Sequence, residues 1–159
     1  MQIRTQDLLS DEAVGTVVKA LEAHREDIEQ GAPVEVQTDV MRPRILLADD
    51  YPGMLTALTR LLELDHDIVG CVADGDAALE AAVRLVPDVV VLDLNIPNGN
   101  GLETCQKITH AIPQTKVIVL TAVHDEHVRE RALAMGASAF VEKQADMNHL
   151  LSAIRAACR

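Results

Sequence analysis

Aromatic residues are almost missing from this sequence. Tyr51 and Phe140 are the only two among 159 residues, and there is no tryptophan. Because nucleobases and flat cofactors are commonly held by stacking on aromatic rings, this composition argues against a single-stranded nucleic-acid platform and against a flavin-binding scaffold. Hydrophobic residues still make up 48% of the chain, so a domain of this length can bury a core, and that core must be aliphatic.

Positive charge is also scarce. Only 14 Lys and Arg residues stand against 25 Asp and Glu residues, which gives a formal net charge of −11 at pH 7. Phosphate backbones and anionic membranes attract basic proteins, so we expect no direct nucleic-acid binding and no membrane association. No apolar run approaches the roughly 18 residues of a membrane span, and residues 1–11 lack a signal-peptide pattern. A cytoplasmic location is therefore predicted.

Cysteine is rare and scattered. The three cysteines, Cys71, Cys105 and Cys158, are odd in number and widely spaced, and they form neither a CxxC motif nor a Cys/His pattern. Neither a disulfide framework nor a zinc site is therefore indicated, and we expect three reduced thiols. Cys71 falls in a predicted strand and Cys105 in a predicted helix, so both are expected in the core, whereas Cys158 is expected to be exposed.

The chain changes character near residues 41–43. Before that point, Ser10 is predicted to cap an amphipathic helix, residues 31–33 are predicted to stop it, and residues 34–40 resemble a linker. We interpret residues 1–43 as an N-terminal helical extension and linker that docks on its own domain, mediates a homodimer, or is dispensable. The predicted apolar stripe of this helix consists of Val14, Val17, Val18 and Leu21.

From residue 44 onward, short β-branched runs alternate with longer helical segments. This strict alternation predicts an α/β fold with a doubly wound, five-stranded parallel sheet that has helices on both faces. Ligands of such sheets bind at the carboxyl ends of the strands. The expected strands cover 44–48, 66–72, 88–93, 116–121 and 138–142, and the expected helices cover 52–64, 74–86, 102–111, 125–135 and 146–157.

Polar residues gather at these carboxyl ends. Asp49 and Asp50 end the first strand and Asp93 ends the third, whereas Thr121 and Lys143 follow at the ends of the fourth and fifth. Any one of them alone would be an ordinary cap or turn residue, but the combination indicates chemistry. Three carboxylates repel one another unless a cation joins them, and an all-oxygen site suits Mg²⁺ or Mn²⁺. With the ion bound, Asp93 could attack a phosphoryl group.

Residues 44–159 closely resemble a two-component response-regulator receiver domain, and most of all the receivers of LuxR-family (NarL/FixJ-type) regulators. The resemblance implies the (βα)5 flavodoxin-like receiver fold and a phosphorylation-dependent switch in a phosphorelay. The motifs that carry it are ILLADD at 45–50, VVVLDLNIP at 89–97 with Gly101, VLTA at 119–122 and GASAFVEK at 136–143.

The resemblance also implies a role for each site residue. Asp93 would accept the phosphoryl group from a histidine kinase or phosphotransfer protein. Asp50, Asp93 and the backbone carbonyl of Asn95 would hold Mg²⁺, with Mn²⁺ as an alternative, and Asp49 would act through ordered water. No separate substrate turnover is expected, so the protein is predicted not to be an enzyme in the usual sense.

Thr121 and Lys143 are implied to hold the phosphoryl group. Phe140 would be the switch aromatic that turns inward when Thr121 moves, with a plain core aromatic as its alternative. Two positions depart from the family pattern. Gln144 follows Lys143 where many receivers have a proline after a cis bond, which is costly at other residues. Tyr51 follows the acidic pair and either reaches into the crevice or only covers it.

Two alternative functions stay open at this point. A degenerate receiver would keep the fold and serve only for docking, although the intact site residues argue against it. A Mg²⁺-dependent phosphohydrolase with an aspartyl nucleophile would need an Asp two residues after Asp93, where this sequence has Asn95. LuxR-family receivers are normally followed by a helix-turn-helix output domain, so we expect either a stand-alone receiver or part of a transcription regulator.

Overall fold

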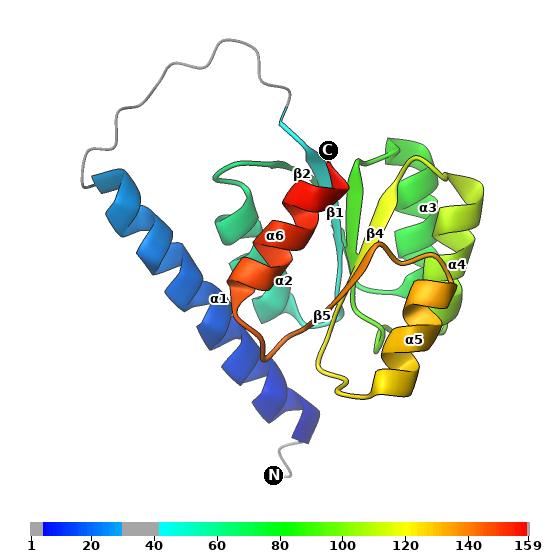
Figure 1. Cartoon of the computed structure of the whole chain (residues 1–159), viewed down its shortest axis with the longest axis horizontal. Helices are drawn as coiled ribbons and strands as arrows, with labels where there is room; N and C mark the ends of the chain where they lie inside the picture. Colours follow the sequence, from blue (N-terminus) through cyan, green and yellow to red (C-terminus); the bar gives the residue numbers. More distant parts are fainter. Residues whose placement is uncertain (1–4, 30–41, 159) are drawn as a thin grey trace.

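Figure 1 shows the computed structural model of the chain, which describes residues 5–29 and 42–158. Strands and helices alternate along residues 44–157, as the sequence pattern predicts, and one long helix precedes them. The elements are α1 Thr5–Glu29, β1 Arg44–Ala48, α2 Pro52–Leu62, β2 Asp67–Val72, α3 Gly75–Leu85, β3 Val89–Leu92, α4 Gly101–Ala111, β4 Lys116–Thr121, α5 Glu126–Ala134, β5 Ala139–Glu142 and α6 Met147–Ala157.

The strands form one parallel sheet in the order β2-β1-β3-β4-β5. This order confirms the predicted doubly wound, five-stranded fold. The direction of winding reverses between β1 and β3, and in register Ala48 of β1 lies opposite Leu92 of β3. The residues that follow these two strands therefore emerge side by side, and this reversal is where such sheets leave a crevice.

Most predicted boundaries are correct to within one or two residues. Several helices begin one residue later than the pattern suggested because an aspartate with non-helical backbone angles precedes them as the N-cap. The carboxylates of Asp74, Asp125 and Asp146 accept backbone N–H groups of the first turns of α3, α5 and α6. Such caps satisfy donors that have no partner within the helix.

Two aliphatic layers enclose the sheet, which confirms the expectation of a core with few aromatic rings. One layer lies between the sheet and α1, α2 and α6, and it includes Ile45, Leu47, Leu58 and Leu150. The other lies between the opposite face and α3, α4 and α5, and Phe140 is buried in this second layer. The two layers hold the strand ends in fixed positions on the edge where the site residues emerge.

The N-terminal helix differs from its prediction at its start. It begins at Thr5, so Ser10 lies inside the helix and the predicted cap at Ser10 is wrong. No glycine or proline interrupts residues 5–14, and the helix can therefore extend toward the N-terminus past the serine. The predicted stop at residues 31–33 and the linker at 34–40 lie outside the described residues.

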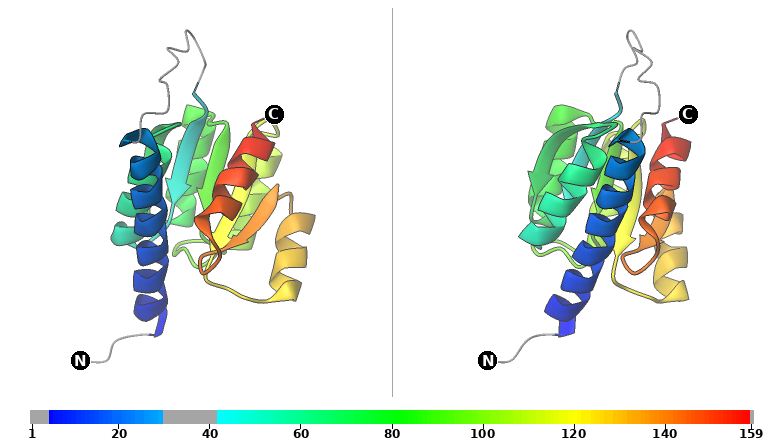
Figure 2. Two further views of the ribbon diagram at one scale, coloured as in Figure 1. Left: turned by 60° about the vertical axis from the view of Figure 1, so that its left-hand side comes forward. Right: turned by 90° about the vertical axis from the view of Figure 1, so that its left-hand side faces the viewer.

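The apolar face of α1 packs on its own chain. Figure 2 shows α1 lying along α2 with α6 on its other side. Ala13 and Val17 are fully buried there, whereas Val18 of the predicted stripe is exposed, so the buried face is turned toward Ala13. None of the helices in residues 5–29 and 42–158 is long and apolar enough to cross a membrane.

The cysteines differ from expectation at one position. Cys105 of α4 is buried and Cys158 is exposed, as predicted, but Cys71 is exposed. The prediction of a buried Cys71 is wrong because β2 is the edge strand of the sheet, and its residues are only partly covered. A sequence pattern that identifies a strand does not say whether that strand lies at the edge.

These environments predict thiol reactivity. Burial raises the pKa of Cys105 to about 11, and partial burial with the nearby Asp88 also raises the pKa of Cys158. Because the thiolate is the reactive form, a disulfide reagent at neutral pH should label Cys71 fastest, then Cys158, and Cys105 only after unfolding in urea. The Cys71→Ser/Cys158→Ser variant should show no fast reaction in the folded state. Equal rates for all three thiols would contradict this arrangement.

Candidate acidic site at the carboxyl edge of the sheet

The parallel ladder extends one residue beyond the strands and fixes the backbone of the site. The Asp49 amide donates to the Val72 carbonyl (3.1 Å), and the Asp93 amide donates to the Ala48 carbonyl (2.9 Å). On the other side of the sheet, the Lys143 amide donates to the Thr121 carbonyl (2.8 Å). The site residues thus start from backbone positions that the sheet itself determines.

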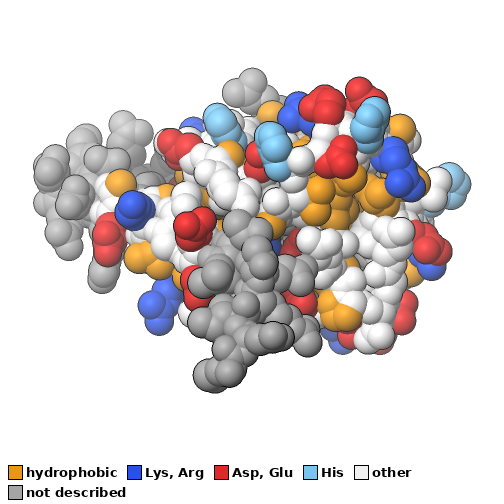
Figure 3. Space-filling view, turned by 90° about the horizontal axis from the view of Figure 1, so that it is seen from below, with side chains coloured by type: hydrophobic (Ala, Val, Ile, Leu, Met, Phe, Trp, Pro, Cys, Tyr) orange, Lys and Arg blue, Asp and Glu red, His pale blue; other side chains and the backbone are white. Residues whose placement is uncertain are grey.

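Three carboxylates meet at this edge, as the sequence predicts. Asp49, Asp50 and Asp93 each have a carboxylate oxygen within 4.8 Å of the others. Asp49 and Asp93 are buried, with 3% and 5% of their surface exposed, whereas Asp50 is exposed. Acidic side chains face the viewer on this side of the molecule in Figure 3. The cluster is therefore buried at its base and open to solvent on one side.

The Lys143 ammonium joins the two buried carboxylates. Its Nζ donates to Oδ2 of Asp49 at 2.7 Å and to Oδ2 of Asp93 at 2.9 Å, and Lys143 itself is 3% exposed. Burial alone would lower the pKa of Lys143, but attraction by Asp93 and Asp49 outweighs it and holds that pKa above its ordinary value. The lysine therefore enters the site as a cation.

One ammonium does not balance this cluster. Burial, together with repulsion from Asp93, raises the pKa of the Asp49 carboxyl although Lys143 acts in the opposite direction. A hard divalent cation would supply the missing positive charge, and carboxylate oxygens are the ligands that Mg²⁺ prefers. The residues present therefore fit such an ion in donor type, in number and in charge.

The remaining oxygens of the buried carboxylates are held by the turns that follow them. Oδ1 of Asp49 accepts the backbone N–H of Tyr51 (2.9 Å), and Oδ1 of Asp93 accepts the backbone N–H of Asn95 (3.1 Å). These short Asx-type turns fix each carboxylate plane. Asn95 lies in the turn next to Asp93, where its sequence position suggested it would lie.

The loop after β3 is shaped by glycines. Asn98 and Gly99 have positive φ values of 54° and 132°, a range of backbone conformation that glycine adopts more readily than other residues. At Gly101, a Cβ atom would lie 2.4 Å from the Leu94 backbone, so no larger residue fits. This close packing keeps the turn that contains Asn95 against the start of α4.

The other predicted site residues are also placed by their strands. Thr121 is fully buried at the end of β4, and its hydroxyl oxygen accepts the Val123 amide (3.3 Å). Phe140 is already buried on the α5 side of the sheet.

The Lys143–Gln144 bond is trans, because residues 5–29 and 42–158 contain no cis peptide bond. His124 is exposed and pairs with Glu142 (2.8 Å).

One hydrogen bond near the site could not be predicted from any sequence motif. The Tyr51 hydroxyl donates to Oδ1 of Asp11 (2.5 Å), so the tyrosine joins α1 to the turn after β1. The two residues are 40 positions apart. Only the fold brings them together, and no motif contains both.

The lysine bridge predicts a large difference between two lysine substitutions. Lys143→Met leaves two buried carboxylates without their partner, so the free energy of unfolding should fall by about 3 kcal/mol. Lys107 is the control: it is 55% exposed and pairs with Glu103 at 3.2 Å, so Lys107→Met should cost less than about 0.5 kcal/mol. Urea unfolding with EDTA present measures both. Equal losses would mean that Lys143 does not neutralise the cluster.

Comparisons with known proteins identify the family. The family described as "Response regulator receiver domain" matches residues 45–155. The oxygen regulatory protein NreC of Staphylococcus haemolyticus is 34% identical over 115 residues, which cover 70% of this chain and 53% of NreC. A crystal structure of a LuxR-family two-component response regulator from an Aurantimonas species is 30% identical with a TM-score of 0.69. That match covers 73% of this chain and 84% of the other.

A more distant structure adds a chemical detail about a relative. A response regulator protein from Burkholderia pseudomallei, solved with a phosphorylated aspartic acid, a calcium ion and citrate, is 25% identical with a TM-score of 0.66. The match covers 70% of this chain and 66% of that protein. The chain spans about half the length of the curated relatives it matches. The phosphohydrolase and docking-only alternatives are not favoured, and the chain belongs to the response-regulator receiver domain family, among the receivers of LuxR-family two-component regulators.

Proposed function

We propose that Asp93 is the phosphoacceptor of this receiver. It takes a phosphoryl group from the phosphohistidine of a histidine kinase or phosphotransfer protein. The observation that carries the proposal is the Lys143 ammonium, which bonds to Asp49 and Asp93 at the base of an open acidic cluster. A cation held at that point stabilises the additional negative charge of an incoming phosphoryl group.

The metal is part of the same proposal. Asp50, Asp93 and the backbone carbonyl of Asn95 would hold Mg²⁺, with Mn²⁺ as a second candidate, and Asp49 would act through ordered water. When bound, the ion supplies positive charge to the phosphoryl oxygens. The three clustered carboxylates and the single ammonium support this assignment, because they leave a deficit of positive charge at the site.

The chain's own residues have distinct tasks in the transfer. An Asp93 carboxylate oxygen attacks phosphorus, and the P–N bond of the phosphohistidine breaks. Its electron pair returns to the imidazole nitrogen, which takes up a proton, and an acyl phosphate remains on Asp93. Lys143 neutralises charge on the transferred oxygens, and the Thr121 hydroxyl donates a hydrogen bond to one of them.

Two features of known relatives support this proposal. The Burkholderia response regulator holds a phosphorylated aspartic acid, and the NreC proteins are regulators about twice the length of the matched region. We infer that this chain is the receiver part of a LuxR-family transcriptional regulator, or a stand-alone relative of one. In either form it would be a phosphorylated signalling switch of a two-component system, with no separate substrate to turn over.

Phosphorylation by a small donor tests the acceptor. Acetyl phosphate with Mg²⁺ should add the mass of one phosphoryl group to the wild-type protein. Asp93→Asn keeps the size of the side chain but removes the nucleophilic carboxylate, so its labelling should be lost. Intact-mass spectrometry measures both proteins, with EDTA as the metal control. Equal labelling of the variant would exclude Asp93, and an unlabelled wild-type protein would favour a docking-only receiver.

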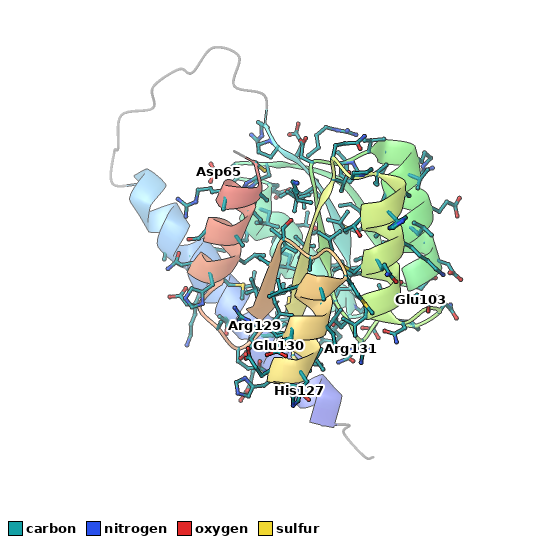
Figure 4. All side chains as sticks on the ribbon, turned by 45° about the vertical axis from the view of Figure 1, so that its right-hand side comes forward. Asp65, Glu103, His127, Arg129, Glu130 and Arg131 are labelled. Atoms are coloured by element: carbon teal, nitrogen blue, oxygen red, sulfur yellow. The ribbon has the colours of Figure 1, made fainter. Side chains whose placement is uncertain are left out.

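A switch surface is the second element of the proposed function. Helix α5 is the least anchored of the helices after β1, because Ala132 is its only buried residue. Figure 4 shows His127, Arg129, Glu130 and Arg131 on this helix, and all four are exposed. If Thr121 moves toward a phosphoryl oxygen, the adjoining loop and α5 can shift at little cost, and Phe140 can adjust beside them.

A phosphoryl mimic tests the switch. Beryllofluoride with Mg²⁺ should shift amide NMR signals throughout residues 121–143, because the loop after β4 and α5 follow Thr121. Thr121→Ala should still bind the mimic but lose most of the shifts in α5, since it lacks the hydroxyl. Signals that change only next to Asp49, Asp50 and Asp93 would mean that this surface does not respond to the site. Light scattering of the same samples reports any change in self-association.

A further inference from the structure

Helix α1 lies outside the part of the chain that matches the receiver family, yet it contacts the edge of the acidic site. The family match begins at residue 45, whereas the contact comes from Asp11. Its carboxylate accepts the hydrogen bond from the Tyr51 hydroxyl at 2.5 Å. The extension is therefore joined by a side-chain hydrogen bond to the residue that directly follows the acidic pair.

Tyr51 connects this helix to one of the buried carboxylates. Its backbone N–H donates to Oδ1 of Asp49 at 2.9 Å, while its hydroxyl bonds to Asp11. The ring lies against Gly53, where an added Cβ would come within 3.1 Å of the ring, and it packs on the same core layer as α1. Tyr51 is therefore held in place by its backbone N–H, its ring and its hydroxyl group.

Helix α1 is itself anchored next to Asp11. Ala13 and Val17 are fully buried against the layer that contains α2 and α6, and Val14 and Leu21 are partly buried there. Asp11 lies within two residues of the first of these anchors. A helix held in this way restricts where the Asp11 carboxylate can go, and Asp11 in turn restricts the Tyr51 side chain.

We propose that α1 positions the metal site through Asp11 and Tyr51, so that docking of α1 on α2 and α6 strengthens Mg²⁺ binding. The proposal rests on the Mg²⁺ site of the proposed function. The Asp11–Tyr51 bond holds the turn that orients Asp49, which lowers the cost of organising the site.

Thermodynamic linkage makes the effect reciprocal. If docked α1 raises the affinity of the site for Mg²⁺, Mg²⁺ must strengthen the docking of α1 by the same factor. Asp11 and Tyr51 are positioning residues in this scheme, since neither is a proposed ligand of the ion. A purely structural role for α1 would stabilise the fold without any dependence on the metal.

The experiment measures Mg²⁺ binding to the full chain and to three single variants. Amide NMR signals near Asp93 give the dissociation constant. Tyr51→Phe keeps the ring and its backbone N–H, and Asp11→Ala removes the acceptor, so each should raise Kd about three- to tenfold, as for loss of one partly exposed hydrogen bond to a charged group. Glu12→Ala removes the same charge from an exposed neighbour on α1, and its Kd should stay within about twofold of the wild type, because surface charges act weakly.

The double variant and hydrogen exchange complete the test. Tyr51→Phe/Asp11→Ala should bind Mg²⁺ no more weakly than either single variant, because both act through one hydrogen bond. Mg²⁺ should slow amide exchange in residues 11–23 of the wild type but not of Tyr51→Phe. Two results overturn the proposal while leaving the metal site intact: a wild-type Kd in Tyr51→Phe, or equal effects of Glu12→Ala and Asp11→Ala. A wild-type chain that binds no Mg²⁺ would instead refute the proposed function, and this inference with it.

Discussion

The pairing of the Lys143 ammonium with two buried carboxylates is the interaction on which the rest of the site depends. Asp49 and Asp93 emerge side by side because β1 and β3 are neighbours in the sheet, and burial makes their mutual repulsion costly. Lys143 reaches both carboxylates from the end of β5, across β4. The strand order therefore brings the cation and both acids to the same edge of the sheet.

Most of this arrangement could be predicted from the sequence because it depends on local patterns. Runs such as residues 89–92 are apolar without interruption, which is the signature of a strand buried on both faces. Once the strands are assigned, the residues after them must share one edge, so Asp49, Asp93 and Thr121 could be placed together without any coordinates. The aspartates that cap α3, α5 and α6 were predicted as the first residues of those helices, one position away from their observed role.

What the sequence did not reveal depends on neighbours far along the chain. Cys71 was predicted to lie in the core because it lies in a strand, but the strand order places β2 at the edge of the sheet and leaves Cys71 exposed. The stripe on α1 contains Val18, which periodicity alone cannot separate from the buried Val17. The bond between Tyr51 and Asp11 joins residues 40 positions apart. Each of these features depends on which other elements a helix or strand packs against. A periodic pattern shows that one face of the element is buried, but not what covers it.

The helices after β1 are anchored unequally, and α5 is anchored least although it lies on the same face as the well-buried α3 and α4. On one face, α1, α2 and α6 share a continuous apolar layer that reaches Tyr51 at the margin of the acidic site. On the other face, α5 contributes a single buried residue beside Phe140 and follows the loop from Thr121. Movement is cheaper where fewer apolar contacts are lost, so among the helices after β1 it is α5 that can shift at the lowest cost.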